Sequence, residues 1–108
     1  MRVYILKIDY YDELSHECGA SDILNVYSDK KECIKELLGH LDGEIKDKHI
    51  IEDNKNIKEI EENIKELISN NMTIRFCGYM TKYDYEQGNS DFEYIIEERE
   101  VIQQEDFK

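Results

Sequence analysis

The spacing of apolar residues constrains the fold of this chain most strongly, because it changes from strand period to helix period and back again. Residues 3–10 alternate between two faces, which is typical of a β-strand. One of these faces consists of Tyr4, Leu6, Ile8 and Tyr10. Residues 23–27 predict a second short strand, and the polar segment 12–22, which contains Gly19, predicts the loop between the two strands. The chain is therefore expected to begin with a hairpin that has a long loop.

Two amphipathic helices are predicted in the middle of the chain. Ser28 and Asp29 supply N-cap residues for the first helix, over about residues 29–41. Its apolar stripe consists of Ile34, Leu37, Leu38 and Leu41. Asn56 begins the second helix, whose apolar stripe consists of Ile57, Ile60, Ile64, Leu67 and Ile68. This helix is expected to end at Asn70 and Asn71, and the mostly charged residues 42–55 predict a connector between the two helices.

The last third of the chain returns to strand period. Residues 72–85 predict a long strand with a core face of Met72, Ile74, Phe76 and Met80 and a second face that carries Tyr79, Tyr83 and Tyr85. Residues 86–90 predict a turn, and Phe92, Tyr94 and Ile96 predict the core side of a fourth strand. The order ββααββ favours an α+β fold, in which a four-stranded antiparallel sheet carries both helices on one face and is open on the other. We expect a single domain, residues 1–108, that ends in an acidic strand and tail over residues 84–108.

The formal net charge of −12, from 26 acidic and 14 basic residues, limits the kinds of partner. Nucleic acids and anionic membranes are bound by Lys and Arg side chains that neutralise them, so we expect no direct binding to either. The expected partner is instead a basic protein surface. Residues 84–108 hold nine acidic residues and only two basic ones. The three cysteines are irregularly spaced and no apolar run approaches the ~20 residues of a membrane span, so a cytoplasmic protein without a disulfide framework is expected.

The tyrosines and carboxylates near the C-terminus form the predicted partner-binding surface. Pairing of the last two strands would bring them together on the open face of the sheet, and tyrosine is enriched in protein interfaces. Tyrosine is also common on antiparallel strands for packing alone, so both readings stay open. The predicted partner-binding residues are Tyr79, Tyr83, Asp84, Tyr85, Glu86, Asp91, Glu93, Glu97, Glu98 and Glu100.

No residue pattern in the chain predicts catalysis or a cofactor. A set of four possible zinc ligands is present: His16, Cys18, Cys33 and His40. Their spacing matches no standard structural zinc site, and Cys33, beside the apolar Ile34, is better explained as a small buried residue. The five scattered glycines form no phosphate-binding loop. We therefore expect no metal, no cofactor and no enzymatic activity. A small metal protein or enzyme is the third hypothesis, after the inhibitor and the self-associating domain described below.

The chain resembles, in composition, the small acidic proteins that phages and mobile elements encode, including anti-CRISPR proteins and other DNA mimics. The likeness lies in its small size, its acidic, tyrosine-containing surface and its richness in Ile, Lys, Glu and Asn. It implies stoichiometric inhibition of a nucleic-acid-binding protein without chemistry, and no individual residue carries over. A second resemblance, to small phage proteins, lies in Val3-Tyr4-Ile5-Leu6 and Val26-Tyr27-Ser28, and implies only a strand–strand–helix arrangement.

These features together predict a non-catalytic intracellular inhibitor that binds a basic surface of a nucleic-acid-binding protein, with an anti-CRISPR DNA mimic as its specific form. Duplex DNA carries one charge per ~1.7 Å of its axis, whereas same-face residues of a strand are ~6.8 Å apart. Mimicry would therefore need carboxylates from both strand faces and from the hairpin. The alternative is an acidic regulatory or structural domain that forms a homodimer through the open face of its sheet.

Overall fold

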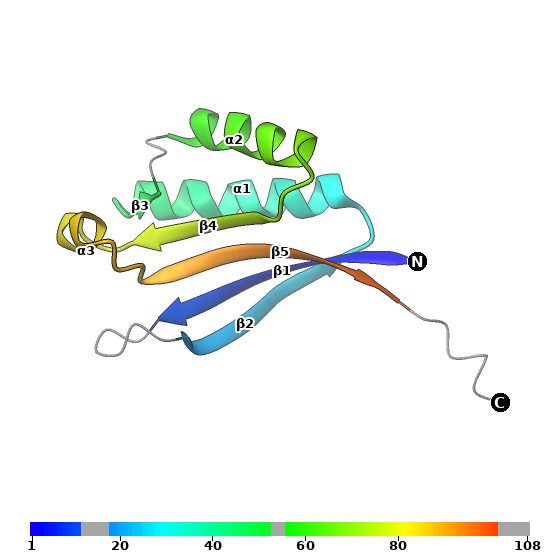
Figure 1. The fold of residues 1–108 in the computed structure, drawn as a ribbon, viewed down its shortest axis with the longest axis horizontal. Helices are drawn as coiled ribbons and strands as arrows, with labels where there is room; N and C mark the ends of the chain where they lie inside the picture. The colour runs from blue at the N-terminus through cyan, green and yellow to red at the C-terminus, as the bar shows by residue number, and fades with distance from the viewer. Residues whose placement is uncertain (12–17, 53–55, 102–108) are drawn as a thin grey trace.

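A computed structural model describes residues 1–11, 18–52 and 56–101, and these form an α+β fold with three helices and a five-stranded antiparallel sheet (Figure 1). The strands are β1 (Arg2–Tyr11), β2 (Cys18–Tyr27), β3 (Ile50–Ile51), β4 (Ile74–Tyr79) and β5 (Phe92–Glu100). The helices are α1 (Lys30–Lys46), α2 (Ile57–Ser69) and α3 (Lys82–Gln87). The expected four strands in the order ββααββ are wrong, because β3 lies between α1 and α2 and α3 lies between β4 and β5.

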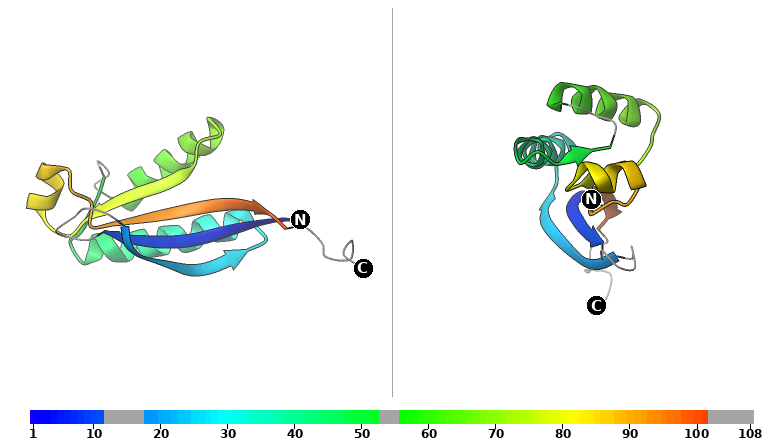
Figure 2. Two further views of the ribbon diagram at one scale, coloured as in Figure 1. Left: turned by 60° about the horizontal axis from the view of Figure 1, so that its bottom comes forward. Right: turned by 90° about the vertical axis from the view of Figure 1, so that its left-hand side faces the viewer.

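The sheet has the strand order β2-β1-β5-β4-β3, and every neighbouring pair is antiparallel. β1 pairs with β2 on one side and, from Arg2 to Tyr10, with β5 on the other. β4 pairs only with the first part of β5, since Ile74 is aligned with Ile96. Figure 2 shows α1 and α2 on the same side of the curved sheet. The second face of the sheet carries neither of these two helices.

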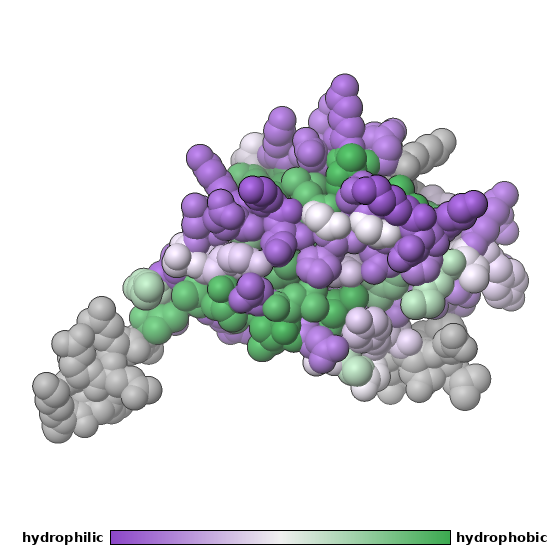
Figure 3. All heavy atoms as spheres, turned by 180° about the vertical axis from the view of Figure 1, so that it is seen from behind, coloured by the Kyte–Doolittle hydropathy of each residue, from purple (hydrophilic) through white to green (hydrophobic). Residues whose placement is uncertain are grey.

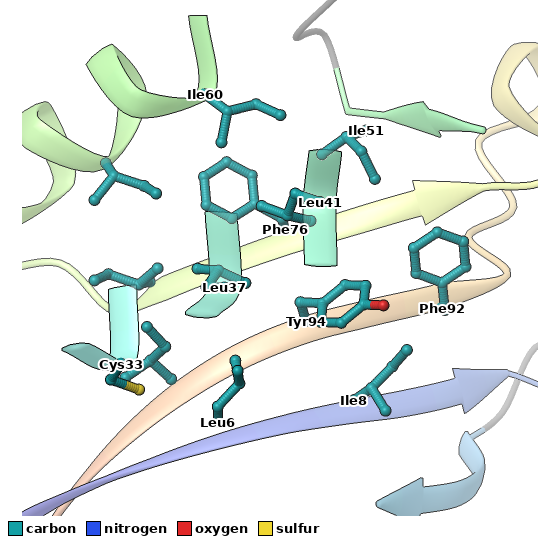
Figure 4. Close-up of a cluster of buried hydrophobic side chains, with 13 residues drawn as sticks. Leu6, Ile8, Cys33, Leu37, Leu41, Ile51, Ile60, Phe76, Phe92 and Tyr94 are labelled. Carbon is teal, nitrogen blue, oxygen red and sulfur yellow. The ribbon is translucent and has the colours of Figure 1, made fainter. Parts of the chain in front are cut away.

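The core lies between the covered face of the sheet and the two long helices (Figure 4). Its buried side chains are Leu6, Ile8, Cys33, Leu37, Leu41, Ile51, Ile60, Ile64, Ile74, Phe76, Phe92, Tyr94 and Ile96. The prediction that Cys33 is a small buried residue is confirmed, and burial raises the pKa of its thiol to about 11. Two predicted core residues, Met72 and Met80, are instead 58% and 49% exposed, because both lie outside β4.

α1 is longer than the predicted helix. Asp29 caps it, since its side chain accepts a hydrogen bond from the Lys31 N–H at 2.9 Å. The helix continues past the two glycines at positions 39 and 43 to Lys46, because a helical glycine costs only about 1 kcal/mol. Burial of Leu41 and packing of Ile45 against the core offset this cost. The expected helix end near residue 41 is therefore wrong.

α2 matches the prediction closely. Asn56 is its N-cap, with a side-chain oxygen that accepts from the Glu59 N–H at 3.0 Å, and Asn70 is its C-cap. Ile60 and Ile64 of the predicted apolar stripe are buried. No helix in the described parts of the chain is both long and apolar enough to cross a membrane.

β2 begins earlier than the predicted start at Ile23. Residues 18–22 of the expected loop belong to this strand, whereas residues 12–17 lie outside the described residues. The pairing of Asp9 with Ser21 accounts for the extension, since the Ser21 hydroxyl donates to the Asp9 carboxylate at 2.6 Å. Cross-strand hydrogen bonds of this kind let a polar segment form a strand that the apolar pattern does not show.

Candidate partner-binding site

The predicted tyrosines do not share one long strand, because β4 ends at Tyr79 and α3 follows. The Thr81 hydroxyl caps α3 by accepting a hydrogen bond from the Asp84 N–H at 3.1 Å. Gly88 ends the helix with a left-handed φ of 72°, a conformation that glycine adopts without steric cost. The expectation that Tyr83 and Tyr85 continue the strand is wrong. The pattern Thr81-x-x-Asp84 followed by Gly88 is the sequence signal that could have predicted this helix.

α3 presents one tyrosine to solvent and packs the other. The Tyr83 side chain is 67% exposed, whereas the ring of Tyr85 lies edge-on to that of Tyr79 with centroids 5.2 Å apart. The Asp91 carboxylate accepts a hydrogen bond from the Met80 N–H at 2.7 Å, which joins the start of this segment to the residue before β5. The short helix is therefore held at both ends. We call Tyr79, Met80, Tyr83, Asp84, Tyr85 and Glu86 the α3 patch.

The carboxylates of the α3 patch form few ion pairs with cations of the same molecule. Glu86 lies 3.9 Å from Lys82, and both side chains are more than half exposed, so this pair contributes little. No ion pair joins Asp84 to another described residue. Figure 1 shows α3 at the same end of the molecule as the connected ends of β1 and β2. Asp9 of β1 and Asp22 of β2 lie toward these ends, and together with Asp84 and Glu86 of α3 they make this the acidic end of the molecule.

Three carboxylates of β5 are compensated within the molecule. Glu97 lies 2.7 Å from the Lys7 amino group and 3.1 Å from Arg99. Hydrogen bonds from these two side chains hold the pKa of Glu97 below its usual value. Glu98 is paired in the same way, and Lys30 and Arg2 surround it at 3.0 and 2.9 Å. The hydrogen bond from Lys30 is the main cause of the lowered pKa of Glu98.

Glu100 follows the same pattern with two weaker partners. Its carboxylate lies 3.2 Å from the Met1 amino group and 3.5 Å from Arg2. The predicted surface of free carboxylates along β5 is therefore a row of ion pairs. A basic partner would have to replace existing cations at these positions.

Glu93 is buried, contrary to the expectation that it lies on an exposed surface. Its carboxylate meets the Arg75 Nε at 2.6 Å, and it accepts a hydrogen bond from the Tyr11 hydroxyl at 2.6 Å. Oε1 accepts no hydrogen bond from the described residues, so Arg75 compensates that oxygen by charge alone. The hydrogen bond to Glu93 raises the pKa of Tyr11, with burial as the second cause. The cluster thus pairs a buried carboxylate with a half-exposed arginine.

Cys77 adjoins this cluster on the same face of the sheet. Its sulfur lies 3.7 Å from Glu93 Oε2, and burial is the first cause of its raised pKa. A hydrogen bond with Ser90 acts in the opposite direction, and the negative charges of Glu93 and Glu52 add to the effect of burial. The thiol is therefore held in its protonated, unreactive form. Sequence reasoning missed this cluster, because Tyr11, Arg75 and Glu93 are far apart in the chain.

The four possible zinc ligands do not form a site in the described residues. His16 and the side chain of Cys18 lie outside the described residues. Cys33 is buried in the core, whereas His40 is exposed on α1, with its ring 5.8 Å from that of Tyr94. No group of three metal-binding side chains converges among the residues described.

A groove of about 430 Å³ lies at the other end of the sheet, where β5 extends beyond β4. The last turn of α2, residues 71–73 and residues 97–99 of β5 line it. Its charged side chains are already paired, since Lys30 contacts Glu98 and Arg99 contacts Glu97. The described residues of this groove thus leave no acid or base free for proton transfer.

Comparison with known proteins gives no relative. No protein-family model, no curated protein and no solved structure matches the chain.

Proposed function

We propose that the protein is a non-catalytic binding protein that attaches through the α3 patch to a basic surface of another protein. In this role it inhibits a nucleic-acid-binding protein in the cytoplasm. One observation carries the proposal: exposed Tyr83 and Glu86 of α3 lie close in the chain to exposed Met80, whereas the carboxylates of β5 at positions 97 and 98 are already compensated.

The chemistry of the α3 patch favours a protein partner. Tyr83 and Met80 are 67% and 49% exposed, and both residue types are enriched in interfaces. A rigid tyrosine side chain supplies contact area at low entropic cost. Asp84 directly follows Tyr83, Glu86 lies three residues after it on α3, and both can attract Lys or Arg on a partner. Rim charges of this kind mainly raise the association rate and make it depend on salt.

The choice of a nucleic-acid-binding partner rests on charge. A protein with a net charge of −12 is attracted to the same basic grooves as nucleic acid and repelled by nucleic acid itself. The compositional resemblance to anti-CRISPR proteins makes a CRISPR effector the first partner to test. The acidic end of the molecule, which bears α3 and the connected ends of β1 and β2, would enter the groove.

Capture from a lysate of the source cells tests this function. The wild-type chain should retain a nucleic-acid-binding protein that added duplex DNA or RNA displaces. The double variant Tyr83→Ser, Glu86→Lys should retain at least about tenfold less, since loss of one interface tyrosine can cost ~2 kcal/mol.

The matched control is Glu66→Lys with Met72→Ser, which makes the same change in net charge. Glu66 is exposed on α2 and Met72 is 58% exposed, so the control also removes one exposed apolar side chain. Retention by the control at the wild-type level supports the α3 patch. Equal loss in both variants would mean that overall charge, and not this patch, drives binding.

A further inference from the structure

The last part of β5 has a sheet partner on one side only. The ladder between β4 and β5 ends at the pair of Ile74 and Ile96, whereas β1 pairs with β5 as far as Glu100. Figure 1 shows β5 continuing past the start of β4. Residues 97–100 therefore form a free edge of the sheet, and they lie beside the groove at this end of the molecule.

This edge presents the backbone groups of Glu98 and Glu100. Residues along an antiparallel pair alternate between hydrogen-bonded and non-hydrogen-bonded positions, and the backbone groups of the second kind point to the other side of the strand. The Val101 N–H donates to the Met1 carbonyl at 2.7 Å, and the register with β1 has no shift, so the odd-numbered residues of β5 face β1. Glu98 and Glu100 face away from β1. No described residue forms a hydrogen bond with the backbone of Glu98.

β4 does not continue along this edge, because the residues before it complete the end of α2. The Asn71 N–H donates to the Ile68 carbonyl at 3.1 Å, and the Met72 N–H donates to the Leu67 carbonyl at 2.8 Å. Asn71 has a left-handed φ of 54°, which asparagine adopts more readily than most residues. These bonds turn the chain from α2 into β4, and Figure 2 shows the start of β4 diverging from β5.

The groove beside the free edge has an apolar lining. Ile74 and Ile96 are buried at its base, and Ile68 and Met72 are 38% and 58% exposed at its border. All four side chains lie on the side of the sheet that carries α2. A ligand that enters the groove therefore gains apolar contact on this side.

Two acidic and two basic side chains also line the groove, and all four are in ion pairs. Glu98 lies 3.0 Å from Lys30, and Glu97 lies 3.1 Å from Arg99. These four charges cancel, on a molecule whose net charge is −12. A charged ligand would have to separate one of the pairs, whereas an uncharged ligand leaves both intact.

We propose that the groove binds an extended, uncharged peptide segment of a partner protein, which adds to residues 97–100 of β5 in line with β4. Free backbone N–H and C=O groups on a sheet edge are complementary to another extended chain, and main-chain hydrogen bonds supply affinity in this mode of recognition. An edge of four residues is ~13 Å long, so it holds about four residues of the segment. The proposal does not depend on the function of the α3 patch.

The side chains of the bound segment would alternate between the two faces of the sheet. The residue opposite Glu98 would place its side chain in line with Ile74 and beside Ile68, so an apolar residue is expected there and two positions further on. The residues between them would lie on the face of Glu97 and Arg99. The expected segment is therefore an alternation of apolar and uncharged polar residues.

A nuclear magnetic resonance titration of the isotope-labelled full chain tests the proposal. The probe is the blocked peptide acetyl-Thr-Val-Thr-Val-Thr-amide, added to millimolar concentration. The amide signals of residues 71–74 and 97–100 should shift until they saturate, and exchange of the Glu98 amide should slow. Methylation of both valine nitrogens removes the N–H groups that would face β5, so binding should weaken at least ~tenfold. Methylation of the middle threonine nitrogen, which would face away from β5, is the matched control and should change binding little.

A pair of variants at Glu98 tests the same contact from the protein side. Glu98→Pro removes the N–H donor, and proline is tolerated on sheet edges where that N–H has no partner. It should bind the peptide at least ~tenfold more weakly than Glu98→Ala, which loses the same side chain but keeps the N–H. The methylated peptides need no variant, so they decide the question even where Glu98→Pro does not fold.

Four results would overturn the proposal. The first is the absence of saturable shifts, and the second is equal binding of the two methylated peptides. The third is a Glu98 amide that is already protected from exchange in the free chain, since another part of the chain would then cover the edge. The fourth is a set of shifts centred on β2. Figure 3 shows apolar side chains gathered over β1 and β2, where Ile23 and Val26 are 66% and 49% exposed, so this surface is the competing site for an apolar peptide.

Discussion

Replacement of Gly78 by alanine should destabilise the fold because of one aromatic ring. Gly78 is aligned with Phe92 across β4 and β5, and the Phe92 side chain covers the glycine. A Cβ atom at Gly78 would overlap Phe92 Cε2 and Cζ. Phe92 is 1% exposed and its ring lies edge-on to that of Tyr94, with centroids 5.7 Å apart. The ring therefore has little room in which to move away.

The expected magnitude follows from two opposing effects. Alanine on a strand with free space around it is more stable than glycine by roughly 0.5–1 kcal/mol. Overpacking of a filled core costs about 1–3 kcal/mol, and the contact at Gly78 is with ring atoms of a buried side chain. We expect Gly78→Ala to lower the free energy of unfolding by about 2 kcal/mol, which is a large share of the ~5–15 kcal/mol typical of a domain.

Urea denaturation followed by circular dichroism measures this loss. The partner variant is Phe92→Leu, which removes Cε2 and Cζ, the two nearest of the three ring atoms that meet the new methyl group, and replaces Cδ2 by the end of a flexible side chain. In that background Gly78→Ala should be neutral or slightly stabilising, which gives an interaction energy on the order of 2 kcal/mol. The control is Gly39→Ala on α1, where an added Cβ meets no atom within 4 Å and should stabilise the helix by about 0.5–1 kcal/mol.

Two results would refute this reasoning. One is a Gly78→Ala variant as stable as the wild-type chain. The other is an equal loss of stability in the wild-type and Phe92→Leu backgrounds, which would place the cost in the backbone and not in the ring contact.

Three further predictions concern ion pairs and helix caps. The free energy of unfolding should fall as pH is lowered from about 5 to 2, because the pKa values of Glu97 and Glu98 are lower in the folded chain than in the unfolded one. This stabilisation is complete above the unfolded pKa and is lost as pH falls through the folded pKa, so urea midpoints that do not change with pH contradict it. Asn56→Ala should cost ~1 kcal/mol in the same assay, since it removes the hydrogen bond to the Glu59 N–H, and Asn56→Ser should restore most of the loss. Thr81→Ala should leave global stability nearly unchanged while it speeds amide exchange in α3, because a helix of six residues depends on its cap; exchange at the wild-type rate would contradict this.

The sequence predicts the parts of the fold in which local pattern and tertiary packing agree. α2 has a capping residue and an uninterrupted apolar stripe, so its bounds were predicted closely. The core face of β5 was also predicted, since Phe92, Tyr94 and Ile96 are all buried. The other face of β5 was predicted to be open to solvent, which is wrong at Ile95. Its side chain is only 3% exposed and lies beside Lys7 and Arg75 on the neighbouring strands.

The remaining elements depend on contacts that local patterns do not show. β3 has two residues and forms only because β4 pairs with it. α3 continues the alternation of tyrosines seen in β4, so period alone predicts a strand, and only its cap residues indicate a helix. The extension of β2 depends in the same way on its partner, since Asp9 accepts the Ser21 hydroxyl.

The candidate site shows why a count of acidic residues does not locate a binding surface. The sequence concentrates carboxylates after residue 83, yet folding brings Lys7, Lys30 and Arg2 from the first third of the chain onto those of β5. The carboxylates that keep their charge available are those with no close ion pair within the described residues, or only a long and exposed one. Asp84 and Glu86 meet this condition on α3, and their positions depend on a helix that the apolar period conceals. A basic partner is therefore expected to bind at α3, at one end of the molecule, and not along β5.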